Sequence, residues 1–191
     1  MIFIAGPHGA GKTKSAEIMA RFGFLCIDLG PTLRKIHSKN DTGLSFEMWL
    51  RENERIYGPF FTDELLIAEI LRAKEFVERG KDCVDIAIVG SRSKIGIEKI
   101  CAVVPNVNNH VNYVIFIDAK FGMLLERYNS REKVGLDSES FSELLKKDLS
   151  IGLDSIRGAA DFMISNDSDV CSLESKIREI IFQRLCYETR S

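Results

Sequence analysis

The stretch Gly6-Pro7-His8-Gly9-Ala10-Gly11-Lys12-Thr13 decides the fold. Its spacing, Gly-x-x-x-x-Gly-Lys-Thr, is that of a P-loop, in which glycines allow a tight turn and successive backbone N–H groups point at phosphate oxygens. The apolar run Ile2–Ala5 before it predicts a strand, and residues 12–22 after it have helical spacing. The helix N-terminus adds positive partial charge, so the stretch predicts a site for a nucleoside triphosphate.

The positions of this motif have separate expected roles. Lys12 supplies a mobile cation for the β- and γ-phosphates, and the Thr13 hydroxyl ligates Mg²⁺, which makes Mg²⁺ the expected cofactor of an ATP co-substrate. His8 is expected to act as a spacer in the loop and not in catalysis. The residues expected to bind ATP here are Gly6, His8, Gly9, Ala10, Gly11, Lys12, Thr13 and Lys14.

Short apolar runs alternate with helical stretches along the rest of the chain. The runs are continuous rather than alternating, which is typical of strands covered on both faces and predicts an α/β fold with a parallel sheet. Ligands of such sheets bind beyond the carboxyl ends of the strands. The expected strands are 2–5, 24–28, 83–90, 113–118 and 161–165, and the expected helices are 12–22, 62–79, 94–104, 121–131, 141–160 and 173–187.

The composition predicts one globular domain over 1–191. The chain is 45% hydrophobic and 28% charged, and a chain of this length buries a core without disulfides or metals. A net charge of −2 gives no reason to expect a nucleic-acid polymer as partner, and no apolar run reaches the roughly 18 residues of a membrane span. The N-terminal Met-Ile-Phe-Ile-Ala is too short for a signal-peptide core.

The cysteines and histidines predict neither a disulfide framework nor a zinc site. The five cysteines include no Cys-x-x-Cys pair, and Cys26 and Cys83 lie in apolar runs, where buried thiols are expected. The three histidines are far apart and lack metal-ligand spacing. A reduced, cytoplasmic protein is therefore expected.

Missing motifs narrow the class of P-loop protein. The chain has no Asn-Lys-x-Asp and no Asp-x-x-Gly segment of a guanine-specific GTPase, and the run from Ile86 to Arg92 has no acid at its end, unlike a remodelling ATPase. Arginines follow strands two and three, and two more lie four apart on one helix, where guanidinium groups suit phosphate oxygens. These are Arg34, Arg92, Arg127 and Arg131, and they favour a small-molecule kinase.

Taken in order, these segments resemble the nucleoside monophosphate kinase superfamily, in particular adenylate-kinase-like and dephospho-CoA-kinase-like proteins. The resemblance rests on the P-loop, Leu29-Gly30-Pro31-Thr32-Leu33-Arg34, Val89-Gly90-Ser91-Arg92-Ser93, the Arg127/Arg131 pair and Ala160-Asp161-Phe162-Met163-Ile164-Ser165-Asn166. It implies a three-layer αβα P-loop kinase fold with a five-stranded parallel sheet in the order 2-3-1-4-5. It also implies a small helical acceptor-binding insertion over 38–61 and a short lid over 132–140.

The resemblance also implies roles for single residues. Arg34 and Arg92 would hold the phosphate of a small phosphorylated acceptor, and Asn166 would lie beside the base of ATP. Arg127 and Arg131 would bracket the lid and act in catalysis with Lys12 and Arg92. The protein would be a monomer or a homodimer.

Two departures leave alternatives open. Val89 stands where many relatives have an acid, so Asp28 becomes a candidate to help hold Mg²⁺ or bind the acceptor, although it equally suits a cap of the following turn. Pro31 replaces an aspartate that relatives have after Gly30. The expected acceptor is a (deoxy)nucleoside monophosphate. The alternatives are a dephospho-CoA-type kinase acting on a hydroxyl, and a regulatory nucleotide-binding protein with little turnover. Trp49 is expected to anchor the insertion.

Overall fold

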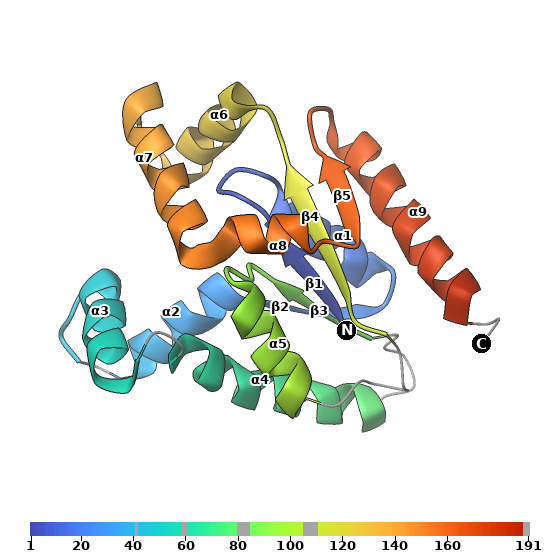
Figure 1. Cartoon of the computed structure of the whole chain (residues 1–191), viewed down its shortest axis with the longest axis horizontal. Helices are drawn as coiled ribbons and strands as arrows, with labels where there is room; N and C mark the ends of the chain where they lie inside the picture. Colours follow the sequence, from blue (N-terminus) through green and yellow to red (C-terminus); the bar gives the residue numbers. More distant parts are fainter. Residues whose placement is uncertain (41, 59–60, 80–84, 105–110, 189–191) are drawn as a thin grey trace.

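The structure is a computed structural model that describes residues 1–40, 42–58, 61–79, 85–104 and 111–188. Within these residues, parallel strands form a five-stranded sheet in the order β2-β3-β1-β4-β5 (Figure 1). This order confirms the one implied by the resemblance. The first residues of the run expected over 83–90 lie outside the described residues. The strands are β1 Ile2–Ala5, β2 Phe24–Asp28, β3 Asp85–Val89, β4 Tyr113–Asp118 and β5 Phe162–Ser165.

Helices cover both faces of the sheet, so the molecule has three layers (Figure 1). Successive side chains of a strand point to opposite faces, and β1 divides accordingly. Ile2 and Ile4 pack in a core with α1 (Lys12–Arg21) and α9 (Val170–Glu188). Phe3 and Ala5 pack in a second core with α4 (Phe61–Arg79), α5 (Lys94–Val103) and α8 (Asp154–Gly158). The fold class predicted from the sequence is confirmed.

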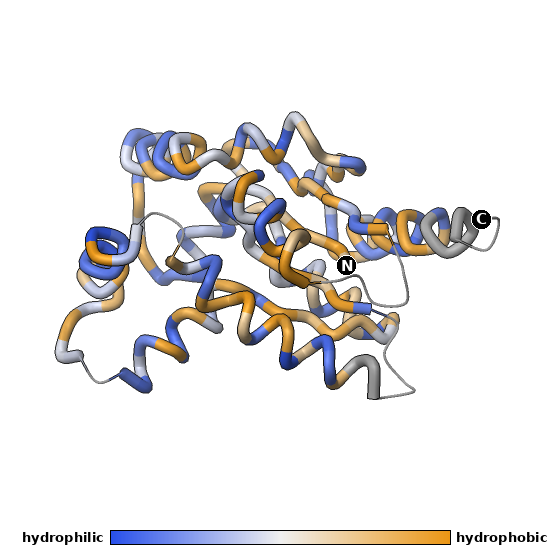
Figure 2. The backbone as a smooth tube through the Cα atoms, turned by 60° about the horizontal axis from the view of Figure 1, so that its bottom comes forward, coloured by the Kyte–Doolittle hydropathy of each residue, from blue (hydrophilic) through white to orange (hydrophobic). Residues whose placement is uncertain are grey.

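Hydropathy follows this layering. Figure 2 shows hydrophobic residues running through the central strands, whereas the outer helices alternate between hydrophobic and hydrophilic residues. Burial of both strand faces explains why the strands are continuous apolar runs in the sequence. Among the described residues, no helix is both long and apolar enough to cross a membrane.

The segment after β2 differs from the prediction, because a helix begins at once. This helix, α2, spans Leu29–Lys39, where the sequence predicted no helix. Asp28 is its N-cap, and Oδ1 of that residue accepts a hydrogen bond from the Gly30 N–H at 3.2 Å. Pro31 is tolerated because it lies in the first turn, where a helix needs no N–H donor.

The insertion consists of the end of α2 and helix α3, Phe46–Tyr57, which leads to α4. Trp49 is only 3% exposed and lies against the rings of His37, Phe46 and Phe61. The anchoring role predicted for Trp49 agrees with these contacts.

The prediction of a single helix over 141–160 is wrong. Helix α6 (Phe121–Glu132) is followed by α7 (Ser138–Asp148), a π-helical turn (Leu149–Leu153) and α8. Gly152 interrupts the run with φ 115°, a backbone conformation that other residues rarely adopt. In the segment 132–140, expected to be a lid, residues 133–137 connect α6 to α7, and the Asn129 side chain binds both the N–H and the carbonyl of Leu136. Its role as a lid remains a prediction.

We expect Gly152→Ala to lower the free energy of unfolding by about 1–2 kcal/mol, because a residue with a Cβ is strained at positive φ. The added Cβ would lie 3.5 Å from the Ser93 Cβ, an ordinary contact, so the cost is conformational rather than steric. Urea unfolding measures it. Gly122→Ala is the matched control, since it lies in α6 with open space around it and should be neutral or slightly stabilising. Equal losses in both variants would contradict the requirement for positive φ.

Candidate functional site

The P-loop lies at the carboxyl end of β1 and leads directly into α1. Gly9 has φ 79°, and a Cβ on it would lie 2.3 Å from the backbone oxygen of Leu124 in α6. Only glycine fits this position, because the loop packs directly on the backbone of a neighbouring helix. The loop is therefore held in one shape by packing from outside.

Lys12 folds back over the loop. Its Nζ donates hydrogen bonds to the carbonyls of Gly6 at 2.7 Å and Pro7 at 2.8 Å. Burial lowers the pKa of Lys12 to about 8, and the positive charges of Arg92 and Arg131 lower it further, while Asp148 acts in the opposite direction. Lys12, Arg92 and Arg131 thus share one small region of positive potential, as the binding of several phosphates requires.

Thr13 and Asp28 lie together beside the loop. The Thr13 Oγ1 is 3.3 Å from Oδ2 of Asp28, whose Oδ1 caps α2. A hydroxyl and a carboxylate oxygen at this spacing are the type of ligand that Mg²⁺ prefers, so the residues fit the ion. The two interpretations of Asp28, as a helix cap and as a group at the site, are compatible because each uses a different oxygen.

Asn166 lies under the loop rather than on an open surface. Its side chain is buried and its Nδ2 donates to the Ala10 carbonyl at 2.9 Å. A Cβ on Gly11 would come within 2.5 Å of the same nitrogen. Asn166 therefore holds the P-loop against the end of β5. Its expected place beside the base of ATP remains a prediction.

The predicted arginines do not all converge. Arg92 and Arg131 are close enough to Lys12 and His8 to lower both pKa values. Arg127 instead donates to the carbonyls of Asn166 at 2.9 Å and Ser168 at 3.2 Å. Arg127 thus orders the loop after β5, and its catalytic role remains a prediction.

Arg34 and Lys14 lie to the side of this group. The Arg34 guanidinium stacks over the Phe46 ring at 5.4 Å. The position that a Cβ on Gly30 would take is 3.7 Å from both Arg34 Nη1 and Asp28 Oδ1, which places Arg34 on the Asp28 side of the site. Lys14 is exposed and forms an ion pair with Glu17 at 2.6 Å.

Sequence reasoning missed Asp148, the last residue of α7. Asp148 is 9% exposed, and its Oδ2 lies 3.5 Å from Nε2 of His8. The His8 ring also makes an edge contact with Tyr128, with centroids 5.5 Å apart. The pKa of His8 is lowered to about 4, mainly because the ring is buried. The negative charge of Asp148 raises this pKa, and the positive charges of Lys12, Arg92 and Arg131 lower it further. His8 is therefore a neutral imidazole at neutral pH and does more than space the loop.

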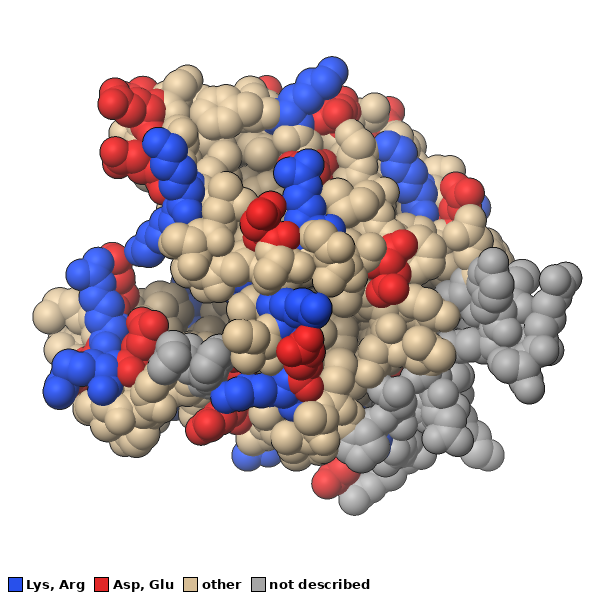
Figure 3. All heavy atoms as spheres, viewed as in Figure 1, with Lys and Arg blue, Asp and Glu red and all other residues tan. Residues whose placement is uncertain are grey.

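The surface has a hollow between the parts of the molecule that carry α7 and α3. Figure 3 shows the molecule hollowed between the lobe of α7 and the lobe of α3, with Lys and Arg side chains along its rim. Lys147 Nζ, from α7, lies 3.9 Å from Oε1 of Glu47 in α3, so the two lobes touch across the cleft. The residue next to Asp148 thus contacts the predicted acceptor-binding insertion.

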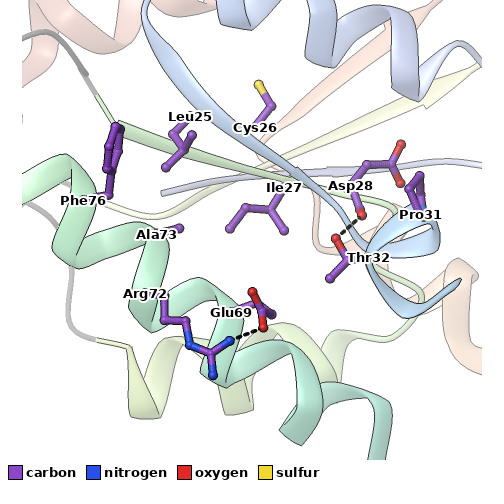
Figure 4. Close-up of a pocket in the computed structure, with 10 residues that line it drawn as sticks. All are labelled: Leu25, Cys26, Ile27, Asp28, Pro31, Thr32, Glu69, Arg72, Ala73 and Phe76. Atoms are coloured by element: carbon purple, nitrogen blue, oxygen red, sulfur yellow. Dashed lines mark hydrogen bonds and ion pairs between the residues drawn. The ribbon is translucent and has the colours of Figure 1, made fainter. Parts of the chain in front are cut away.

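A separate cavity of about 540 Å³ lies at the outer edge of β2. Leu25, Ile27, Ala73 and Phe76 supply its apolar wall, and Arg72 and Glu69 pair with each other on α4 beside it (Figure 4). The Asp28 carboxylate points away from α4 in this view, while its carbonyl accepts from Thr32 Oγ1 at 2.8 Å. The cavity is therefore on the other side of β2 from the carboxylate that faces Thr13.

Comparison with known proteins gives relatives whose names state no activity. The chain is 25% identical to the UPF0200 protein TV0279 of Thermoplasma volcanium, over 95% of this chain and 96% of that one. It is 27% identical to the UPF0200 protein PYRAB09750 of Pyrococcus abyssi, over 98% and 97%. No family model matches the chain.

The solved structures with a similar fold include several kinases. The dephospho-CoA kinase of Campylobacter jejuni has a TM-score of 0.58 and 18% identity, covering 95% of each chain. The shikimate kinase of Acinetobacter baumannii, solved with shikimate, has a TM-score of 0.58 and 17% identity, covering 95% of this chain and 92% of that one. At these identities the likeness defines the fold alone. The chain has a P-loop kinase-like fold.

We expect Asn166→Ala to lower the free energy of unfolding by about 1–3 kcal/mol, because it leaves the buried Ala10 carbonyl without its donor. The same change should weaken ATP binding, since the P-loop loses its support from β5. Chemical denaturation and calorimetric titration with ATP measure the two effects. Asn40→Ala, at the exposed end of α2, is the control. Unchanged ATP affinity in Asn166→Ala would mean that the loop keeps its shape without this bond.

The pKa of His8 predicts an acid-sensitive fold. Its pKa is about 4 in the folded chain and 6.5 in an ordinary environment, so between these values the unfolded chain binds the proton more readily. Stability contributed by neutral His8 is present above pH 6.5 and is lost as the pH falls towards 4. From pH 7 to 4 the wild type should lose about 1–3 kcal/mol more than His8→Gln. Parallel stability curves for the two proteins would contradict the shifted pKa.

Proposed function

We propose that the chain is an ATP-dependent phosphotransferase that moves the γ-phosphoryl group of ATP to a small phosphorylated acceptor. The observation that carries the proposal is the convergence of Lys12, Arg92 and Arg131 at a P-loop of fixed shape. Phosphoryl transfer depends on positioning and on cations around the transferred group, and this arrangement supplies both.

Each group at the P-loop would have a separate role in the transfer. Backbone N–H groups of the loop and Lys12 hold the β- and γ-phosphates, and Asn166 and Leu124 keep the loop in shape. Thr13 and Asp28 would hold Mg²⁺, which offsets phosphate charge when it is bound. Arg92 and Arg131 stabilise the charge on the oxygens of the transferred group. Closure of the 133–137 connection and α7 over the cleft would exclude water.

The acceptor would bind between Arg34, Arg92 and the insertion over 38–61. A (deoxy)nucleoside monophosphate fits this part of the proposal, because two arginines at the mouth of the cleft suit its phosphate. The second candidate is a kinase that phosphorylates a hydroxyl. It is favoured by the Asp28 carboxylate at the end of β2, and by the dephospho-CoA kinase and shikimate kinase among the proteins of similar fold.

A reduced compartment, the cytoplasm, suits this function. Burial raises the pKa of the Cys26 thiol to about 11, and its Sγ lies 3.2 Å from the Ala16 carbonyl. A thiol of this kind is protonated and unreactive at neutral pH, which is the state of a structural cysteine. Cys83, expected to be buried as well, lies outside the described residues.

ATP consumption tests the proposal directly. Purified protein with Mg²⁺ and ATP is given (deoxy)nucleoside monophosphates or dephospho-CoA one at a time, and we expect at least one to stimulate ADP formation. Lys12→Ala should reduce that stimulated rate by about 100-fold or more, because it removes the cation at the β- and γ-phosphates. Arg178→Ala, an exposed basic residue on α9 away from the proposed site, should leave the rate unchanged.

The result that would contradict the proposal is tight ATP binding without stimulation by any acceptor. That outcome would favour the third alternative, a regulatory protein that binds the nucleotide with little turnover.

A further inference from the structure

We propose that Asp148 accepts the proton of the attacking group, with His8 as its positioning residue, and that the acceptor oxygen is therefore a hydroxyl and not a phosphate. This inference rests on the proposed phosphotransfer function and deepens it, because it names the chemical class of the acceptor. It is carried by the position of one carboxylate among the cations of the P-loop.

Asp148 reaches the site because α7 does not continue as an α-helix. The chain passes at Asp148 into the π-helical turn, and π-turns inside helices are frequent at functional sites. Gly152 lies near the end of the turn. A Cβ built on it would be 3.7 Å from the Arg92 carbonyl oxygen and 3.5 Å from the Ser93 Cβ. The turn thus joins the end of α7 to the segment after β3, where the acceptor would bind.

Asp148 acts electrostatically on His8 and Lys12, the same two residues on which Arg92 and Arg131 act. His8 and Lys12 belong to the P-loop and the start of α1, Arg92 follows β3, and Arg131 lies on α6. Tyr128 packs on the far side of His8, and Lys147 reaches Glu47 of the insertion. Asp148 is therefore located where the P-loop, the end of β3 and the insertion meet, which is the place for the acceptor oxygen beside the γ-phosphate.

A carboxylate in this place selects between the two kinds of acceptor. A phosphate acceptor is already ionised and needs no base, and its negative charge would be repelled by Asp148. A hydroxyl carries no charge, donates a hydrogen bond to a carboxylate and must lose its proton during transfer. The buried acid is thus unfavourable for a phosphate and useful for a hydroxyl.

His8 orients the carboxylate. Its Nε2 lies 3.5 Å from Asp148 Oδ2, so a neutral imidazole with its proton on Nε2 would donate to that oxygen after a small approach. The edge contact with Tyr128 holds the ring in place. In the proposed step the other carboxylate oxygen, Oδ1, takes the proton of the acceptor.

The acceptor hydroxyl donates to Asp148 Oδ1 while its oxygen attacks the γ-phosphorus of ATP. The new O–P bond forms as the bond from the γ-phosphorus to the β,γ-bridging oxygen breaks, and ADP leaves with that electron pair. The hydroxyl proton passes to Asp148 and then to solvent, and the product is a phosphate monoester.

The first experiment determines the chemical class of the product. A nucleoside monophosphate offers both a phosphate and sugar hydroxyls, whereas dephospho-CoA offers hydroxyls without a terminal phosphate. ³¹P NMR of the products with each probe distinguishes a new phosphate monoester, which we expect, from a phosphoanhydride. A phosphoanhydride product would overturn this inference and leave the proposed phosphotransfer function intact.

The second experiment tests whether Asp148 acts as a general base or only as a counter-ion. Asp148→Asn keeps the shape and removes the charge, and we expect kcat with the productive acceptor to fall about 100-fold or more. ATP affinity should stay within about threefold, so the loss appears in kcat and not in nucleotide binding. His8→Gln should reduce kcat less than Asp148→Asn and should leave the ATP affinity within the same range. Asp154→Asn, an exposed acid just past the π-helical turn, is the matched control and should match the wild type.

Slow ATP hydrolysis with Mg²⁺ alone gives a readout that needs no identified acceptor, because water then takes the place of the hydroxyl. Asp148→Asn should slow it, whereas a counter-ion role predicts tighter ATP binding with an unchanged or faster rate, which would overturn the inference. If the wild type binds ATP but shows neither hydrolysis nor transfer, the proposed function itself fails and this inference fails with it.

Discussion

The structure depends on holding several positive charges close together around one loop. Lys12, Arg92 and Arg131 come from three different elements, and together they lower the pKa of His8 in the middle of the group. Charges of like sign repel, so the fold must supply rigid support and a counter-charge. Asp148 is the counter-charge that acts on both Lys12 and His8.

The rigid support comes from close backbone contacts rather than from side-chain bulk. Gly9 lets the P-loop touch the backbone of α6, and Gly152 lets the π-helical turn touch the segment that carries Arg92. At Gly9 a side chain would clash with the backbone of α6, whereas at Gly152 any other residue would be strained by the positive φ. The parallel sheet also positions these segments, because its strand order brings the ends of β1, β2 and β3 side by side.

Much of this arrangement could be predicted from the sequence, where the signal is local. The P-loop spacing locates Lys12 and Thr13, and continuous apolar runs indicate a buried parallel sheet. The order of its strands came from the resemblance. Helix α2 was missed because Gly30-Pro31 looks like a turn, although a proline in the first turn costs a helix nothing.

Asp148 could not be found in the same way. It follows Lys146-Lys147 on an ordinary amphipathic helix, and the π-helical turn that directs it into the site depends on tertiary contacts of Gly152. The partners of Arg127 likewise depend on how β5 ends, a long way along the chain. The bond between Asn166 and Ala10 spans 156 positions, and this has a consequence for assembly. Because synthesis runs from the N-terminus, the P-loop leaves the ribosome early but acquires this support only after β5 has joined the sheet. The nascent chain therefore carries an incomplete site until β5 has joined the sheet.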